Sequence, residues 1–383
     1  MGFERLRRIT SSSRFIPEID GLRFIAIALV VFFHIGVFTR FIGSHVVDIR
    51  DSMLSPAASF VFALSRDGDR GVYLFFTISG FILGLPFAKH YVQGAPKVGL
   101  KAYFLRRLTR LEPPYVIATL AVFVLLIAVG KYTFAELWPS LPVTLAYLYN
   151  LLPLGPVING VTWSLEIEVQ FYLLAPILAQ VFRLPRVWRR ALLAALIIGI
   201  PLARLPFPTY PVTLWNYVEY FLLGFLLVDV YLEGLRVPLS RVASAIIGTL
   251  LLCLVVTVNS DYTTPHLTLL GCIFGFYFLV LTDPLWKRLL SIPALTVIGG
   301  MCYSIYLWHY VIISSVGRLT EKAYAHFGHV PLSAQLAINC LVFVPAILLF
   351  STGFYLLIER PCMDKDWPRK LTARLHHFFA TKK

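Results

Sequence analysis

The apolar residues of this chain are gathered into long runs that short polar segments separate. Runs of about 17 to 24 apolar residues match the length of a helix that crosses a bilayer, where each helix satisfies its own backbone groups. The alternating segments of about ten residues that build an outer-membrane barrel are absent. The pattern predicts an all-α, polytopic membrane protein with about ten transmembrane helices around an intramembrane cavity. The predicted spans are residues 22–41, 70–88, 112–130, 163–182, 190–205, 215–232, 242–259, 266–282, 295–316 and 334–357.

The basic residues predict the orientation of these helices. The chain has 34 lysine and arginine residues and a net charge of +14, which could suggest a nucleic-acid partner. Only eight of the 34 fall in the segments that lie outside if the N-terminus is cytoplasmic, so the positive-inside rule accounts for the charge. Residues 1–20 and 359–383 then form basic cytoplasmic tails. No small-residue cleavage site follows the first tail, so a removed signal peptide is not expected.

Two segments fit neither a plain span nor a short connecting loop. The stretch Leu137–Asn159 is apolar but contains four prolines, which disfavour a continuous helix. We expect it to form an outer-face or re-entrant segment that covers a cavity. The predicted outer loop 42–69 carries four aspartates and is a second candidate for substrate contact, although a solvated polar loop is the simpler interpretation.

Four polar side chains fall at similar depths inside the predicted membrane region. From the span boundaries and the helical rise, Ser79, His34, Glu168 and His309 lie about 8 to 12 Å below the outer surface. A single buried histidine is more often structural, but ionisable groups in a membrane interior need partners and commonly mark functional sites. A carboxylate beside a neutral imidazole would orient the ring and raise its basicity, as a general base requires.

The predicted inner loop from Lys89 to Arg110 is rich in basic residues, and topological anchoring alone could explain it. Arg106, Arg107 and Arg110 are spaced so that they share one face of a helix. Guanidinium groups in such an arrangement suit phosphates. Glu112 follows closely and could neutralise Arg110 locally.

Six motifs, in order along nearly the whole chain, resemble those of the acyltransferase-3 family of integral membrane O-acyltransferases. They are Ile19-Asp20-Gly21-Leu22-Arg23 through His34, Gly71 to Phe81, Arg106-Arg107-x-x-Arg110, Trp163-Ser164-Leu165-x-x-Glu168, Tyr303-x-x-Tyr306-Leu307-x-His309, and Glu359-Arg360-Pro361.

The resemblance implies transfer of an acyl group, often acetyl, from cytoplasmic acyl-CoA to a hydroxyl on an extracytoplasmic acceptor. In the family the first-span arginine and histidine are central to activity, which corresponds to Arg23 and His34. The tryptophan-serine-leucine motif selects Glu168 rather than Glu166. Relatives usually carry serine where this chain has Cys302. The chain ends soon after its last motif, so we expect a single membrane-embedded domain without the C-terminal esterase-like domain of some relatives.

In the resulting picture a thioester donor approaches from the basic side, where Arg23 and the three loop arginines hold its phosphates. His34, with Glu168, removes the proton of the acceptor hydroxyl. A further donor must stabilise the oxyanion. The catalytic candidates are His34, Glu168 and His309, and the candidates for the cavity or the oxyanion donor are Ser79, Trp163, Tyr303 and Tyr306. Histidine could also carry the acyl group transiently.

Other functions and ligands are weighed against this one. A proton-coupled transporter or flippase could use the buried His and Glu as a relay, but the internal repeats that would favour it are not seen. A haem protein would use His34 and His309 as axial ligands. The five cysteines show no paired spacing and predict no metal site or disulfide. We expect a multi-pass protein of the inner or plasma membrane, with a glycan, a lipid-linked glycan or a small molecule as acceptor, no bound cofactor and no nucleic acid.

Overall fold

The computed structural model describes residues 6–9, 15–41, 70–204, 212–235, 238–258, 263–327, 330–364 and 367. These residues form helices and connecting turns, and no strand occurs among them. The described part of the chain is therefore all-α, as predicted. The loop 42–69 and the tail beyond Trp367, on which part of the sequence interpretation rested, lie outside the described residues.

Six helical segments in the described ranges are long and apolar enough to cross a membrane. They are built on α1 (Pro17–Phe41), α4 (Arg70–Gln93), α5 (Leu100–Ala128), α8 (Trp163–Leu178), α12 (Thr263–Thr282) and α16 (Leu332–Phe354). A seventh is possible if α14 (Pro293–Gly300) and α15 (Cys302–Phe327) form one span, although the pair bends by 70°. The predicted straight span 295–316 is therefore broken between Gly300 and Cys302.

Three other predicted spans correspond to helices that do not meet the length and charge requirements. The helix α10 (Val218–Leu232) has 15 residues and α11 (Arg241–Thr257) has 17. The helix α9 (Arg186–Arg204) has 19 residues but carries four arginines. The fold thus has the character of a multi-pass membrane protein, but its helices do not by themselves give ten spans.

The remaining elements are short. They are α6 (Phe134–Leu137), α7 (Ser140–Leu145), η2 (Gly160–Thr162), η3 (Ala179–Arg183), η4 (Leu214–Asn216), α13 (Pro284–Leu290), η5 (Tyr355–Glu359) and α17 (Arg360–Cys362). Residues 137–159 contain only short helices and turns, which confirms that this proline-rich stretch is not a plain spanning helix.

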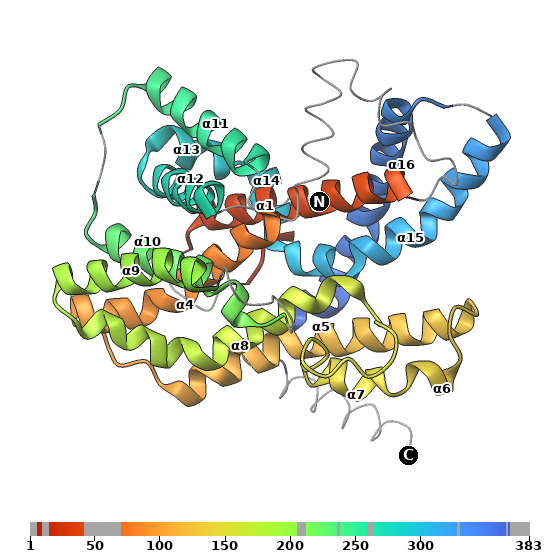
Figure 1. Ribbon diagram of the computed structural model, residues 1–383, viewed down its shortest axis with the longest axis horizontal. Coiled ribbons are helices and arrows are strands. Elements are labelled where there is room, and N and C mark those ends of the chain that lie inside the picture. Colours follow the sequence, from red (N-terminus) through yellow and green to blue (C-terminus); the bar gives the residue numbers. More distant parts are fainter. Residues whose placement is uncertain are drawn as a thin grey trace, which may run out of the picture.

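The helix α1 lies at the centre of the molecule (Figure 1). It packs against α4, α14, α15 and α16, while α5 with α6 and α7 lies to one side. Because α1 is in contact with both α4 and α15, side chains from these three helices can meet in the interior.

The crossing of α4 and α10 is unusually close and fixes the position of Ser79. An ideal Cβ on Gly80 would lie 2.1 Å from the carbonyl oxygen of Phe221, and one on Gly224 would lie 2.4 Å from that of Thr77. Only glycine permits this approach of the two backbones. The helix α4 is therefore held in register against α10 at the residue next to Ser79.

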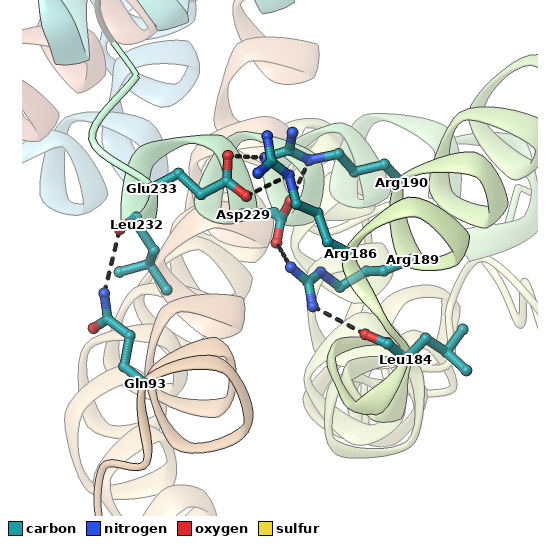
Figure 2. Close-up of polar contacts among 8 residues, drawn as sticks. All are labelled: Gln93, Leu184, Arg186, Arg189, Arg190, Asp229, Leu232 and Glu233. Carbon is teal, nitrogen blue, oxygen red and sulfur yellow. Dashed lines mark hydrogen bonds and ion pairs between the residues drawn. The ribbon is translucent and has the colours of Figure 1, made fainter.

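An ionic network joins α9 to α10 (Figure 2). Asp229 is fully buried and pairs with Arg189 at 2.5 Å and Arg190 at 2.6 Å. Glu233 pairs with Arg190 at 2.7 Å and Arg186 at 2.8 Å. Removing Asp229 would leave the buried guanidinium of Arg189 without its counter-charge, so the network helps to fix the relative position of the two helices.

Candidate functional site

Two histidines from different helices are in direct contact in the interior. His309 Nε2 of α15 lies 3.2 Å from His34 Nδ1 of α1. The same His34 nitrogen lies 2.8 Å from the carbonyl oxygen of Val30, one turn earlier. His309 Nδ1 lies 2.8 Å from the carbonyl oxygen of Tyr306 and 3.1 Å from that of Ile305. His309 is fully buried, whereas His34 is half-buried.

These contacts assign the protons of both rings. A carbonyl oxygen can only accept, so Nδ1 of each ring must carry its proton and donate. His34 Nδ1–H is then shared between Val30 and His309 Nε2, and Nε2 of His34 keeps its lone pair. A neutral imidazole with a free Nε2 and a fixed Nδ1–H is the arrangement that a general base requires.

Ser79 and Glu168 form a second pair, between α4 and α8. The Ser79 hydroxyl donates to Glu168 Oε1, and both side chains are half-buried. Tyr172, one turn further along α8, also interacts with this carboxylate. The guanidinium of Arg107 stacks near Tyr172, with its carbon 5.6 Å from the ring centre. The pair is thus connected through aromatic rings to the basic segment of α5.

The two pairs are separate, which corrects the expectation that Glu168 orients His34. No hydrogen bond joins these two side chains, and His309 occupies the place expected for the carboxylate. Glu168 acts electrostatically on Arg23, Tyr303 and Tyr306. Glu168 therefore lies close to charged and phenolic groups in the N-terminal parts of α1 and α15.

The predicted cavity residues of α8 and α15 already have protein partners. The Tyr303 hydroxyl donates to the Leu111 carbonyl at 3.0 Å. The Tyr306 hydroxyl donates to the Val161 carbonyl and lies 2.7 Å from the Ser164 hydroxyl. To donate to an oxyanion, either tyrosine would have to exchange one of these bonds.

Trp163 lies at the start of α8, where its ring packs 5.4 Å from that of Tyr217. Its carbonyl accepts a hydrogen bond from the Asn150 side chain at 2.9 Å. Trp163 therefore holds the proline-rich segment and η4 against α8, and its direct role in a cavity stays a prediction.

Glu166, the other carboxylate of α8, is buried. Its side chain is 1% exposed, and it accepts a hydrogen bond from the backbone of Asn150 at 2.8 Å. Glu166 and Glu168 point in different directions along α8, as the helical spacing requires. Glu166 anchors the turn at Asn150, and Glu168 faces Ser79.

A cluster of charges surrounds the N-terminal end of α1. Asp20 is buried and pairs with Arg23 at 2.6 Å and with Arg8 at 3.0 Å. Burial and the nearby charge of Arg23 lower the pKa of Arg8 to about 9, so Arg8 stays protonated at neutral pH. One carboxylate thus faces two guanidinium groups, which leaves a net positive charge in this cluster.

The three arginines of α5 do not act as one face. Arg106 is exposed, whereas Arg107 turns inward and lies 3.8 Å from the centre of the Tyr103 ring. The buried Nε of Arg110 has no hydrogen-bond partner among the residues that the structure describes. Glu112 hydrogen-bonds with Tyr147 rather than pairing with Arg110. Arg107 and Arg110 are therefore the members of this cluster that can reach an anion in the interior.

Glu359 positions another helix, a role that the sequence analysis did not predict. There it appeared only as part of the Glu359-Arg360-Pro361 motif. It lies in the π-helical turn η5, is 1% exposed, and accepts hydrogen bonds from the backbone and hydroxyl of Ser304 at 3.0 and 2.5 Å. Ser304 belongs to the first turn of α15, where a carboxylate stabilises the helix through its dipole. Glu359 thus fixes the start of the helix that carries Tyr303, Tyr306 and His309.

Metal and haem chemistry find little support in the described part of the chain. No group of three or more His, Cys, Asp or Glu side chains there could hold a metal ion, and the five cysteines are free. The direct contact between His34 and His309 leaves no room for a porphyrin between the two rings.

The family model for the acyltransferase domain matches residues 16–360. The chain belongs to the acyltransferase-3 family. Since this match covers most of the sequence, including all the side chains of the two pairs, the protein is an acyltransferase. Its multi-pass helical fold fits a membrane member of the family.

The names of similar proteins in this family refer to exopolysaccharide production and to O-acetyl transfer, in one case to peptidoglycan. The exopolysaccharide production protein ExoZ of Rhizobium meliloti is 26% identical, over 80% of this chain and 93% of its own length. The O-acetyltransferase OatA of Staphylococcus aureus is 26% identical over 95% of this chain, and the peptidoglycan O-acetyltransferase OatA of Listeria monocytogenes is 26% identical over 82%. The matched region spans 60% and 52% of these two longer proteins. No solved structure matches significantly.

Proposed function

We propose that this acyltransferase moves an acetyl group from cytoplasmic acyl-CoA to a hydroxyl of an extracytoplasmic glycan or glycolipid. The observation that carries the proposal is the His34–His309 pair, which leaves one imidazole nitrogen free inside the membrane. The names of the O-acetyltransferase relatives support the acyl group and the class of acceptor.

His34 Nε2 is the general base in this mechanism. It takes the proton of the acceptor hydroxyl as the oxygen attacks the acyl carbonyl. The imidazolium that forms donates through Nδ1–H to His309 Nε2 and to the Val30 carbonyl. Both acceptors are fixed before the reaction, so they stabilise the new charge without reorganisation.

The donor enters at the opposite end of α1. Arg23, Arg107 and Arg110 present positive charge there, and the free Nε–H of Arg110 suits a phosphate oxygen. The arm of the donor extends inward from these groups, so its thioester reaches the level of Glu168. Arg106, which is exposed, attracts the donor at longer range.

The topology that this reaction needs has ten spans and both termini in the cytoplasm. The helices α9, α10 and α11 serve as short or charged spans, supported by their packing against α4 and α12. Arg189 and Arg190 are tolerated at one end of α9 because Asp229 and Glu233 pair with them. The lipid bilayer is the remaining partner of the exposed apolar faces.

A transfer assay with purified protein in proteoliposomes tests the function. Labelled acetyl-CoA is supplied on one side, a glycan acceptor on the other, and the acceptor is analysed for an added acetyl group by mass spectrometry. We expect acetylation by the native protein and none by His34→Ala, which should still insert and fold because His34 is half-buried. Movement of the acceptor across the membrane without acetylation would instead establish a transporter or flippase.

A further inference from the structure

We propose that Ser79 carries the acyl group between donor and acceptor, with Glu168 as the base that activates its hydroxyl. This inference rests on the proposed acetyl transfer from acyl-CoA. The geometry that points to it is the presence of two separate hydrogen-bonded pairs in the interior, one on α1 and α15 and one on α4 and α8. A relay has two half-reactions, and the two pairs offer a base for each: Glu168 for the Ser79 hydroxyl and His34 for the acceptor hydroxyl.

The Ser79–Glu168 pair has the composition and accessibility of an activated nucleophile. A hydroxyl that donates to a carboxylate can lose its proton to that carboxylate during attack. The same combination occurs at Ser304 and Glu359, but both of these side chains are completely buried and hold the start of α15. Ser79 and Glu168 are both half-buried, so part of each side chain is exposed.

The order of the groups along the helices fits a relay. Arg23 lies near the N-terminal end of α1, and His34 lies eleven residues further, about 16 Å along the same helix. Glu168 acts electrostatically on Arg23. A donor held at Arg23 is therefore close to the Ser79–Glu168 pair, and His34, further along α1, is available to the acceptor.

The backbone around Ser79 is rigid. The adjacent Gly80 lies so close to the Phe221 carbonyl that even a methyl group at this position would collide with it. The backbone that carries Ser79 is consequently fixed against α10, whose Phe221 ring in turn stacks on Phe171 of α8, as the positioning of a preorganised nucleophile requires.

In the first half-reaction, Ser79 Oγ attacks the thioester carbonyl and its proton passes to Glu168. The carbon–sulfur bond breaks, the proton moves on to the thiolate, and CoA leaves as the thiol while Ser79 holds an ester. In the second, the acceptor oxygen attacks this ester and its proton passes to His34. The bond to Ser79 Oγ breaks, and the proton from His34 restores the serine hydroxyl.

The test is an exchange assay without acceptor. The native protein in detergent is mixed with acetyl-CoA and isotopically labelled CoA, and the appearance of labelled acetyl-CoA is measured. We expect exchange in the native protein and in His34→Ala, and a loss of about 1,000-fold or more in Ser79→Ala. Rapid quenching and digestion should show an acetyl group on the peptide that contains Ser79.

Thr77→Ala is the matched control, because its hydroxyl lies two residues away and donates only to the Tyr73 carbonyl of its own helix. It should keep both exchange and transfer. Ser79→Cys tests the nucleophile independently, in case the alanine variant does not fold. Its thiol should still attack acetyl-CoA, so exchange should be retained and the acetyl group should be found on the cysteine. Thermal unfolding of each variant confirms that the fold is intact.

The possible results separate this inference from the proposed function. Transfer to the acceptor by Ser79→Ala, or transfer by the native protein without exchange or an acetylated Ser79 peptide, would overturn the relay and leave the acetyltransferase function standing. An acetyl group on a histidine peptide would also overturn it. Exchange that depends on Ser79, with no transfer to any glycan, would support the relay and refute the proposed acceptor.

Discussion

Replacing His309 tests the reasoning behind the histidine pair most directly. In His309→Phe the acceptor for the His34 Nδ1–H at 3.2 Å is lost, while the Val30 carbonyl at 2.8 Å remains. Hydrogen bonds to charged groups contribute about 1.5 to 3 kcal/mol. Because the lost contact is the longer of the two, we expect the lower end, about 1.5 kcal/mol, which lowers kcat about tenfold.

The loss should appear in kcat rather than in the KM for acetyl-CoA, because the bond strengthens only when His34 becomes charged. His309→Gln can offer an amide oxygen to His34 and should recover part of the rate. Phenylalanine leaves no new buried polar group unpaired, since the Ile305 and Tyr306 carbonyls keep their bonds within α15. The stability of His309→Phe should therefore change by no more than about 1 kcal/mol.

The measurement is steady-state transfer in proteoliposomes with equal amounts of folded protein and both substrates varied. Tyr310→Phe is the control, because its ring also lies beside that of His34, 5.4 Å between centres, but it is 40% exposed. If His309→Phe is folded and keeps the native kcat, then His309 does not support the charge on His34, and the assignment of the proton positions is wrong.

Three further predictions concern groups around this pair. Glu168→Gln should reduce kcat far more than Glu166→Gln, which kinetics of the two variants measured side by side would check. Glutamine at 168 removes the negative charge beside the Ser79 hydroxyl, whereas glutamine at 166 keeps a side-chain oxygen that can accept from the Asn150 backbone. Arg110→Ala should raise the KM for acyl-CoA more than Arg106→Ala, because Arg106 is exposed, and equal KM values would contradict the assignment. Glu359→Ala should lower the free energy of unfolding by about 1 to 3 kcal/mol by leaving a buried donor unpaired, which thermal unfolding in detergent measures.

The sequence alone determined the class of protein and singled out most of the candidate residues for its site. Long apolar runs specify helices in a membrane because a continuous run of this length satisfies its own backbone hydrogen bonds as a helix, whereas a barrel needs short alternating segments. Polar groups inside such runs are costly, so His34, Ser79, Glu168 and His309 could be recognised without a structure. The prolines of residues 137–159 likewise showed that no spanning helix forms there.

The tertiary structure alone decided which of these residues are partners. Depth along a helix follows from residue number, but the direction in which a side chain faces depends on how helices pack and rotate against one another. That packing joins His34 to His309 instead of Glu168, turns Arg106 away from Arg107, and buries Glu166 against the backbone of Asn150. It also bends the chain before α15 and fixes that bend with Glu359, which lies 55 positions away from Ser304 in the sequence. Contacts of this kind arise from the shape of the folded interior, so no local pattern in the sequence encodes them.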